Sequence, residues 1–178
     1  LRVTRNCPWN QCTFCGLYKG QDFSVRPVED VLKDIDSVRS VITDLQNGKP
    51  LDPAMFDPWS FHTAKAWFDK GMQSVFLQDA NSLVIKPDDL VRILQAIREN
   101  FPQVERVTSY ARSQTVARIS DKDLARLREA GLNRIHIGME SGSDIILKKI
   151  RKGSDKDTHI KAGQKVRKAG IELSEYIM

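Results

Sequence analysis

The chain has no apolar run that approaches the roughly 20 residues needed to cross a membrane. We expect no signal peptide, because residues 1–5 lead directly into a loop that contains cysteine. Its 178 residues suffice for one well-buried domain, and 40% hydrophobic with 29% charged residues is typical of a globular protein. We therefore expect a cytoplasmic protein with no membrane partner.

Cysteine is confined to nine residues of the chain, where Cys7, Cys12 and Cys15 form a C-x4-C-x2-C pattern. An odd number of cysteines in one short loop argues against a disulfide framework and for a reducing compartment. Three thiolates are one short of the four that hold an ordinary [4Fe–4S] cluster or a structural zinc ion. The triplet therefore suggests a metal cluster with one iron left open for a further ligand.

A structural zinc site is the alternative for these cysteines. It would need a fourth ligand such as His62, and the spacing supplies no paired zinc knuckle. The iron–sulfur interpretation is favoured on that ground. Trp9, inside the loop, would then shield the cluster from water and tune its potential.

The net charge of +5 is modest and is spread along the chain. The densest basic cluster, residues 148–152, is typical of the solvated end of a helix. No aromatic residues alternate with these charges, so nucleic-acid binding is an alternative with weak support.

Apolar strands alternate with amphipathic helices, and the same types of residue mark the boundaries between them. Gly71, Gly131 and Gly170 each stand where a helix is expected to end and a short apolar strand to begin. Pro27 and Pro87 mark helix starts. The pattern predicts an α/β fold class, a parallel sheet that is open or curled into a partial (β/α) barrel of about five strand–helix units. The expected strands are residues 1–6, 72–78, 104–109, 133–139 and 171–177.

Residues 47–69 interrupt this alternation and are expected to be an insertion within the domain. Three prolines make the first half irregular, whereas the second half is typical of a short extra helix. The insertion either packs on the outside of the barrel or forms a lid that faces the substrate. In the second case the candidate contacts are Trp59, His62 and Trp67.

Polar segments directly follow four of the expected strands. In parallel α/β folds, functional residues gather at the carboxyl ends of the strands. Convergence of these segments on one rim beside a metal cluster is hard to explain by stability alone. The segments are residues 7–15, 78–82, 109–114 and 140–144.

The chain resembles the core of a radical S-adenosylmethionine (SAM) enzyme. The resemblance is carried by the cysteine triplet with Phe14 just before its last cysteine, by the GMESGSD segment at residues 138–144, and by the strand–helix order that links them. It covers nearly the whole chain, so residues 1–178 would form one radical SAM core. Because the family's barrel usually has six strand–helix units, we expect this core to be truncated at its C-terminus.

Two features depart from the family's pattern. The cysteine spacing has one residue more than the usual C-x3-C-x2-C, which a turn containing Pro8 can absorb. The glycine-rich element that often follows the second strand, Gly-Gly-Glu, is replaced here by Gln-Asp-Ala at residues 78–80. This replacement alters the contact expected with the methionine amino group of SAM.

The resemblance implies that Cys7, Cys12 and Cys15 ligate three irons of a [4Fe–4S] cluster, whose fourth iron binds SAM. A flavodoxin- or ferredoxin-like electron donor would reduce the cluster. Cleavage of SAM would then yield methionine and a 5′-deoxyadenosyl radical that abstracts hydrogen from an unidentified substrate. The alternatives are a non-catalytic module that holds zinc or a structural iron–sulfur cluster, and the core of a larger nucleic-acid-modifying enzyme.

The resemblance also implies which residues bind SAM. Phe14 would pack near the adenine, and Asp79 would line the methionine end. Ser109, Arg112 and Glu140 would bind the ribose hydroxyls or the amino-acid group, with Arg112 suited to a carboxylate and Glu140 to an ammonium. Each has a structural alternative: packing for Phe14, closing a turn for Asp79, capping a helix for Glu140, and simple solvation for the other two.

Two histidines have ambiguous positions. His136 is expected in a strand whose neighbours Ile135 and Ile137 point to the opposite side. It therefore lies either inside the barrel near the cofactor or outside under a helix. His159 is expected to be a surface or packing residue of a late helix.

Overall fold

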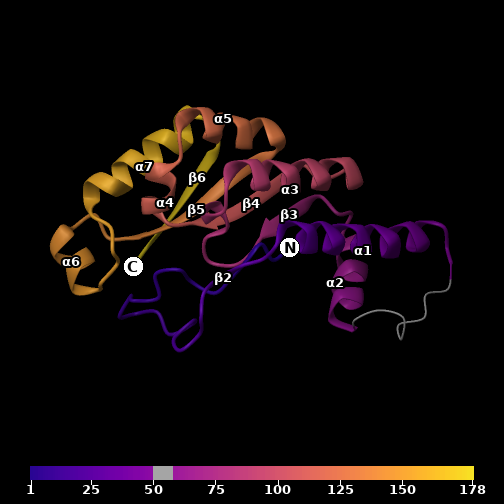
Figure 1. Cartoon of the computed structure of the whole chain (residues 1–178), viewed down its shortest axis with the longest axis horizontal. Coiled ribbons are helices and arrows are strands. Elements are labelled where there is room, and N and C mark those ends of the chain that lie inside the picture. The colour runs from indigo at the N-terminus through magenta and orange to yellow at the C-terminus, as the bar shows by residue number, and fades with distance from the viewer. Residues whose placement is uncertain (50–57) are drawn as a thin grey trace.

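The computed structural model describes residues 1–49 and 58–178. Its main feature is a four-stranded parallel sheet in the order β3-β4-β5-β6, with helices on one face (Figure 1). This arrangement confirms the α/β fold class and is consistent with a partial (β/α) barrel. The strands are β3 (Ser74–Leu77), β4 (Arg106–Ala111), β5 (Leu132–Glu140) and β6 (Glu172–Ile177).

The N-terminal segment lies at the edge of this sheet beside β3. β1 (Thr4–Arg5) pairs antiparallel with β2 (Ser24–Val25), and one parallel bridge joins Arg2 to Gln78. The predicted strand at residues 1–6 is therefore wrong in its extent. Asn6 adopts a left-handed conformation, φ +65°, which ends the strand before the cysteine loop.

The helices pack side by side in chain order, α1 against α3, α3 against α5, and α5 against α7 (Figure 1). None of the described helices is long and apolar enough to span a membrane. The long helices are α1 (Val28–Gln46), α3 (Pro87–Asn100), α5 (Asp121–Ala130) and α7 (Lys156–Lys168). Short helical segments follow three strands: a 3-10 turn (Ser82–Val84), α4 (Ser113–Arg118) and α6 (Asp144–Lys149).

Local chemistry explains where two of these helices begin and end. The Ser120 hydroxyl accepts the Asp123 amide at 3.0 Å and caps α5. The Asp155 carboxylate accepts the Thr158 amide at 2.8 Å and caps α7. Gly131 ends α5 with φ +118°, a conformation that favours glycine.

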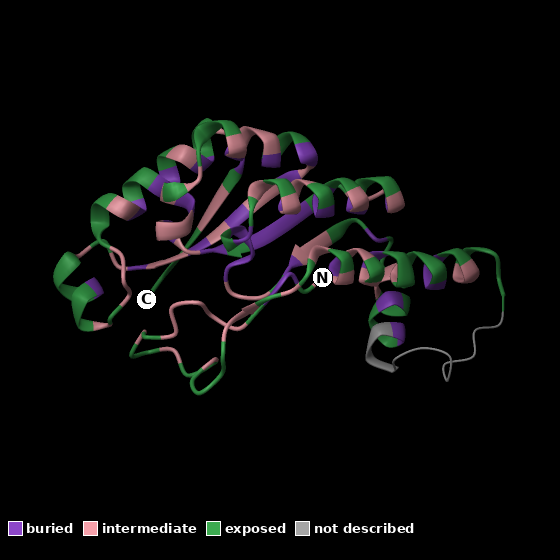
Figure 2. Cartoon of the chain, in the orientation of Figure 1, coloured by how far each residue is buried: buried purple, intermediate pink, exposed green. Residues whose placement is uncertain are grey.

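The hydrophobic core lies between the sheet and the helices, where Figure 2 shows the buried positions of both. Ile135 and Ile137, two residues apart on β5, point to the same face of the sheet and are fully buried in this core. The helices contribute apolar positions at helical spacing to the same cluster, so the sheet has one covered face. These positions include Leu90, Ile93 and Leu94 of α3, Leu124 and Leu127 of α5, and Val166 of α7.

The insertion forms α2 (Pro58–Asp69), which packs against α1. Phe61 and Ala64 of α2 form a small apolar cluster with Val41 of α1. Residues 50–57 and the Trp59 side chain lie outside the described part of the chain.

The two described lid candidates lie away from the carboxyl ends of the strands. The Trp67 ring is 5.0 Å from that of Phe101, and its Nε1 donates to Ser74 O at 2.8 Å. Because Ser74 begins β3, Trp67 belongs to the amino end of the sheet. His62 is exposed on α2.

Candidate functional site

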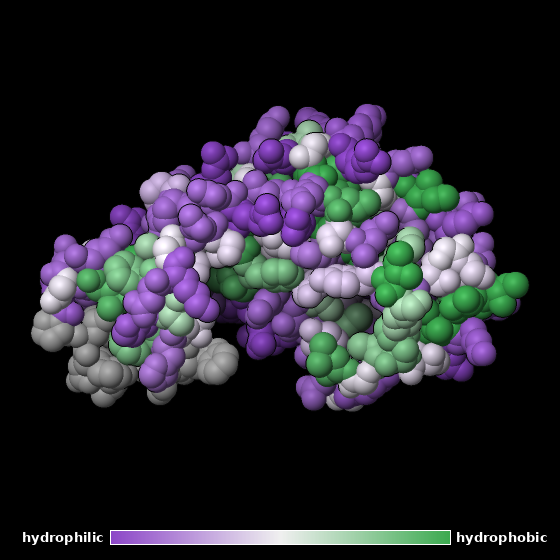
Figure 3. Space-filling model, turned by 180° about the vertical axis from the view of Figure 1, so that it is seen from behind, coloured by the Kyte–Doolittle hydropathy of each residue, from purple (hydrophilic) through white to green (hydrophobic). Residues whose placement is uncertain are grey.

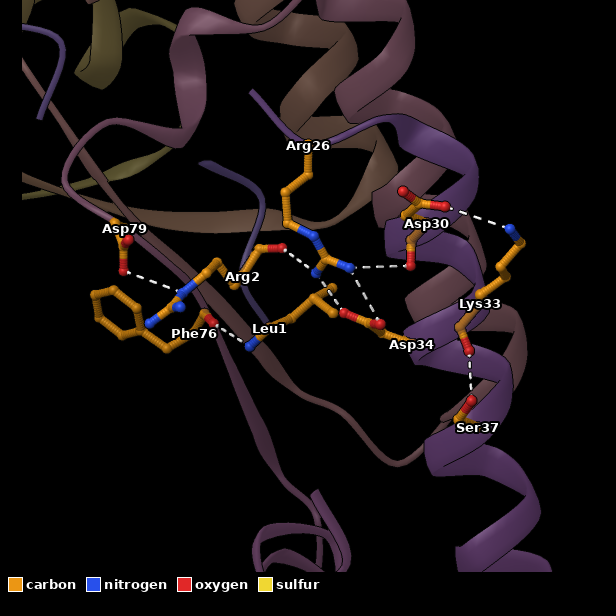
Figure 4. Close-up of polar contacts among 9 residues, drawn as sticks. All are labelled: Leu1, Arg2, Arg26, Asp30, Lys33, Asp34, Ser37, Phe76 and Asp79. Carbon is orange, nitrogen blue, oxygen red and sulfur yellow. Dashed lines mark hydrogen bonds and ion pairs between the residues drawn. The ribbon is translucent and has the colours of Figure 1, made fainter. Parts of the chain in front are cut away.

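The cysteine loop is fixed at both ends. Arg26, which follows the loop, donates to Arg2 O at 2.9 Å and forms an ion pair with Asp34 of α1 (Figure 4). Asp79, just after β3, accepts the Asn6 amide at 2.9 Å and lies 3.6 Å from Arg2 Nε. These contacts hold the two stems of the loop between α1 and the carboxyl end of β3.

The middle of the loop docks on the segment that follows α6. Trp9 Nε1 donates to Arg151 O at 2.7 Å, and the Thr13 amide donates to Ile150 O at 3.0 Å. Gly153 has φ +71°, and a side chain there would collide with the Trp9 ring. Glycine therefore permits the close approach of these two segments.

The three cysteines are free and half-buried in this loop. Asn10 adopts φ +48°, and its amide lies 3.5 Å from Cys7 Sγ as a donor. Asparagine tolerates the left-handed conformation better than most residues. The chain therefore turns between Cys7 and Asn10, within the first cysteine spacing, and this turn includes Pro8.

Two cationic side chains lie near the thiols. Burial raises the pKa of the Cys12 thiol, while Lys152 and then Arg112 act in the opposite direction. Burial lowers the pKa of Arg112, against the pull of Cys7 and Cys12. Nearby positive charge stabilises the thiolate form, which is the form that ligates metal.

Three free thiols are the donor type that an iron–sulfur cluster takes, so the residues of the loop fit that group. In residues 1–49 and 58–178, no group of three or more His, Cys, Asp or Glu side chains is gathered closely enough for one metal ion. Ligands at about 2.3 Å from one zinc ion must lie within about 4 Å of each other, whereas cysteines on separate irons are spaced more widely. His62, the suggested fourth zinc ligand, lies on α2, away from the cysteine loop (Figure 1).

Glu140, at the end of β5, forms an ion pair with Lys152 at 2.8 Å, and their side chains are only 10% and 12% exposed. Glu140 has φ +66°, and a side chain at Gly138 would collide with both partners. Lys152 Nζ also lies 5.7 Å from the centroid of the Phe14 ring. The pair therefore links the end of β5 to the cysteine loop.

The prediction that residues 148–152 form the solvated end of a helix is wrong for Lys152. Lys148 and Lys149 are exposed, but Lys152 turns toward Glu140, 12 residues earlier in the chain. No local pattern distinguishes it from its basic neighbours, so the sequence analysis missed it. Its burial also removes one of the charges on which the nucleic-acid alternative depended.

Arg112 approaches the loop from the end of β4. Its guanidinium carbon lies 4.9 Å from the centroid of the Trp9 ring, and its Nη2 donates to Lys152 O at 3.0 Å. Its amide donates to Oδ1 of the fully buried Asn81 at 3.2 Å. Arg112 is therefore held beside the cysteine loop, and Asn81, which the sequence analysis did not select, fixes its backbone.

The structure does not bring Ser109 into this site. The sequence predicted that the strand ends at Ser109, whereas β4 continues to Ala111. Ser109 is fully buried next to its register partner Ile135, on the face that the helices cover. Its hydroxyl donates to the neighbouring Tyr110 O at 3.0 Å. A contact between Ser109 and SAM is therefore not supported.

Phe14 and Asp79 take different positions in the site. The Phe14 side chain is 41% exposed and is accessible to a ligand. Both carboxylate oxygens of Asp79 interact with the stem of the cysteine loop, which gives this residue a structural role there.

The two ambiguous histidines are also placed. His136 lies on the open face of the sheet, with its ring 5.6 Å from that of Tyr110 and 5.5 Å from that of Tyr176. His159 is buried, and its Nε2 lies 3.1 Å from the Ser154 hydroxyl, so it is a packing residue of α7.

Comparisons with known proteins agree on one family. A sequence model described as the Radical SAM superfamily matches residues 1–178. No curated protein sequence gives a significant match to the chain.

Similar solved structures include OxsB, a cobalamin-dependent SAM radical enzyme, with a TM-score of 0.65, 21% identity, and coverage of 100% of this chain and 23% of that one. Methylornithine synthase (PylB) gives a TM-score of 0.61 at 15% identity, and the match covers 99% of this chain and 43% of that one. A third structure is that of the radical SAM methyltransferase TsrM from Kitasatospora setae, with cobalamin and a [4Fe–4S] cluster bound. It gives a TM-score of 0.64 at 14% identity, and the match covers 99% of this chain and 30% of that one. At these identities the likeness concerns the fold, and the chain spans less than half the length of each protein.

Proposed function

Because this chain belongs to the radical SAM superfamily, we propose that it binds a [4Fe–4S] cluster through Cys7, Cys12 and Cys15 and cleaves SAM there. In this family the cluster and SAM together supply a 5′-deoxyadenosyl radical that abstracts hydrogen from a substrate, while the protein provides binding and orientation. One observation carries the proposal: the clamped loop holds three free, half-buried thiols near the cations Lys152 and Arg112.

The residues around the loop would orient the bound groups and exclude water. Trp9, held by its hydrogen bond and stacked on Arg112, would cover one side of the cluster. The fork of Arg112 suits the SAM carboxylate, and Glu140 suits the ammonium or a pair of ribose hydroxyls. Phe14 offers a half-exposed ring to the adenine. Asp79 would act by holding the loop.

Electron paramagnetic resonance tests the proposal directly. The protein is reconstituted with iron and sulfide without oxygen, reduced with dithionite, and measured with and without SAM. We expect the signal of a reduced [4Fe–4S] cluster that changes when SAM is added, because the iron without a cysteine ligand takes the cofactor. A protein that holds only zinc, or a cluster signal that ignores SAM, would leave a non-catalytic metal-binding module instead.

We further propose that an acidic flavodoxin- or ferredoxin-like protein reduces the cluster at the surface formed by α6 and the cysteine loop. Ile145 of α6 is 82% exposed and Leu17 of the loop is 74% exposed. Lys148 and Lys149 are exposed on the same short helix. Figure 3 shows hydrophobic and hydrophilic residues mixed at this end of the molecule, on the right. We place the enzyme in the cytoplasm, where thiols stay reduced.

Charge reversal on α6 is expected to slow electron delivery. The double variant Lys148→Glu/Lys149→Glu should lower the rate of cluster reduction by an acidic flavodoxin about tenfold at low salt, because it removes electrostatic steering. The loss should shrink as salt is added. Reduction by dithionite should keep its rate, since this small reductant needs no docking surface. Stopped-flow absorption measures both rates.

Lys86→Glu/Lys122→Glu is the matched control. It makes the same charge change at two exposed positions, Lys86 directly before α3 and Lys122 in the first turn of α5. Equal slowing by the two double variants would mean that only net charge matters. An unchanged rate in the α6 variant would move the docking surface elsewhere.

A further inference from the structure

The open face of the sheet carries a continuous row of rings. Phe76, Tyr110, His136 and Tyr176 come from β3, β4, β5 and β6 in that order, and we call them the ring row. Neighbouring ring centroids along the row are 4.8, 5.6 and 5.5 Å apart. These are the spacings of interacting aromatic pairs, so the four strands present one aromatic surface.

Ion pairs lie on both sides of the ring row along the strands. Toward the amino ends, Arg134 of β5 pairs with Glu172 of β6, on the same face by strand alternation. Toward the carboxyl ends, Glu140 pairs with Lys152 at 2.8 Å. The ring row therefore has one ion pair toward each end of the strands.

The ring row lies near the cysteine loop. Tyr110 of β4 comes two residues before Arg112 in the chain. The guanidinium carbon of Arg112 lies 4.9 Å from the centroid of the Trp9 ring in that loop. A molecule on the ring row would therefore be next to the site at which SAM is proposed to bind.

Two properties distinguish the ring row from a packed core. Tyr110 and Tyr176 are 38% and 44% exposed, although their rings are large. His136 Nδ1 is buried and has no hydrogen-bond partner among the described residues. Burial, followed by Arg134, lowers the pKa of His136, which favours a neutral ring whose Nδ1 can accept a hydrogen bond.

We propose that the ring row binds a flat aromatic group of the substrate, and that this group carries an O–H or N–H donor for His136 Nδ1. Flat rings gain from stacking on their neighbours beyond the area that they bury, which an aliphatic group of equal size does not. The donor satisfies an acceptor that is otherwise buried without a partner. This inference rests on the proposed function, because it takes the bound group to be the substrate of the SAM-derived radical.

Three probes separate flatness from hydrogen bonding. Phenol is flat and has a donor, anisole is flat and has none, and cyclohexanol has a donor but is not flat. Binding of each probe to the full chain is measured by ligand-observed nuclear magnetic resonance before a cluster is loaded. We expect phenol to bind tightest, with anisole and cyclohexanol each about three- to tenfold weaker.

Substitutions in the row should change this order in different ways. Tyr110→Leu removes a stacking partner and should weaken phenol and anisole alike, by about three- to tenfold. His136→Phe keeps a ring but removes the acceptor, so anisole should bind as before and phenol should lose its advantage. Ile160→Ala removes an exposed apolar side chain of α7, away from the row, and should leave all three affinities unchanged. Circular dichroism checks that each variant folds.

Three results would overturn the proposal: cyclohexanol binds as well as phenol, Tyr110→Leu binds phenol like the original protein, or SAM displaces phenol. The last result would assign the ring row to the cofactor. Each of them can occur while the cluster signal still responds to SAM. Failure of the proposed function shows separately, as a cluster signal that ignores SAM.

Discussion

Cys12→Ser is expected to abolish cluster binding, with iron and sulfide content at least about tenfold lower after anaerobic reconstitution. The variant keeps only two thiols in the loop, because the chain has three cysteines in all. A serine hydroxyl stays protonated and is a harder ligand than the thiolates that iron–sulfur clusters take. Iron and sulfide analysis, together with the visible absorption of the reconstituted protein, measures the loss.

Thr13→Ala is the matched control for this variant. Thr13 is the exposed neighbour of Cys12, and its backbone amide, which the substitution keeps, makes the hydrogen bond to Ile150 O. We expect it to bind a full cluster. If Cys12→Ser also bound a full cluster, these cysteines would not be the ligand set, and the proposed function would lose the observation that carries it.

Much of the sheet was predictable because its elements carry strong local signals. β5 follows Gly131, whose left-handed conformation ends α5, and it alternates Ile135 and Ile137 with polar residues. The predicted strand at residues 133–139 differs from the observed Leu132–Glu140 by one residue at each end. Such an element needs no information from distant parts of the chain.

The positions of individual site residues were harder to predict, because they depend on which face of a strand the helices cover. Ser109 was expected at the end of its strand, but β4 continues for two further residues and Ser109 lies buried on its covered face. His136 had two equally good positions, and the rings of Tyr110 and Tyr176, from neighbouring strands, identify the open face. Alternation gives two sets of side chains but does not say which set is covered.

Lys152→Met is expected to lower the free energy of unfolding by about 3–5 kcal/mol, the usual effect of breaking a buried ion pair. Methionine keeps most of the length of the side chain but leaves Glu140, only 10% exposed, without the cation that lies 2.8 Å away. Urea unfolding of the cluster-free protein measures the change. Lys149→Met makes the same chemical change at an exposed position of α6 and should alter stability by less than about 0.5 kcal/mol.

The double variant Glu140→Gln/Lys152→Met separates the structural role of this pair from a role in binding SAM. Removing both charges leaves no unpaired carboxylate, so most of the lost stability should return. The SAM-dependent change of the cluster signal should be lost in the double variant, because a neutral amide binds the SAM ammonium poorly. A double variant that regains stability and still shows the SAM response would instead make Glu140 a structural partner of Lys152 alone. If Lys152→Met is as stable as Lys149→Met, solvent screens the pair despite its 10% and 12% exposure.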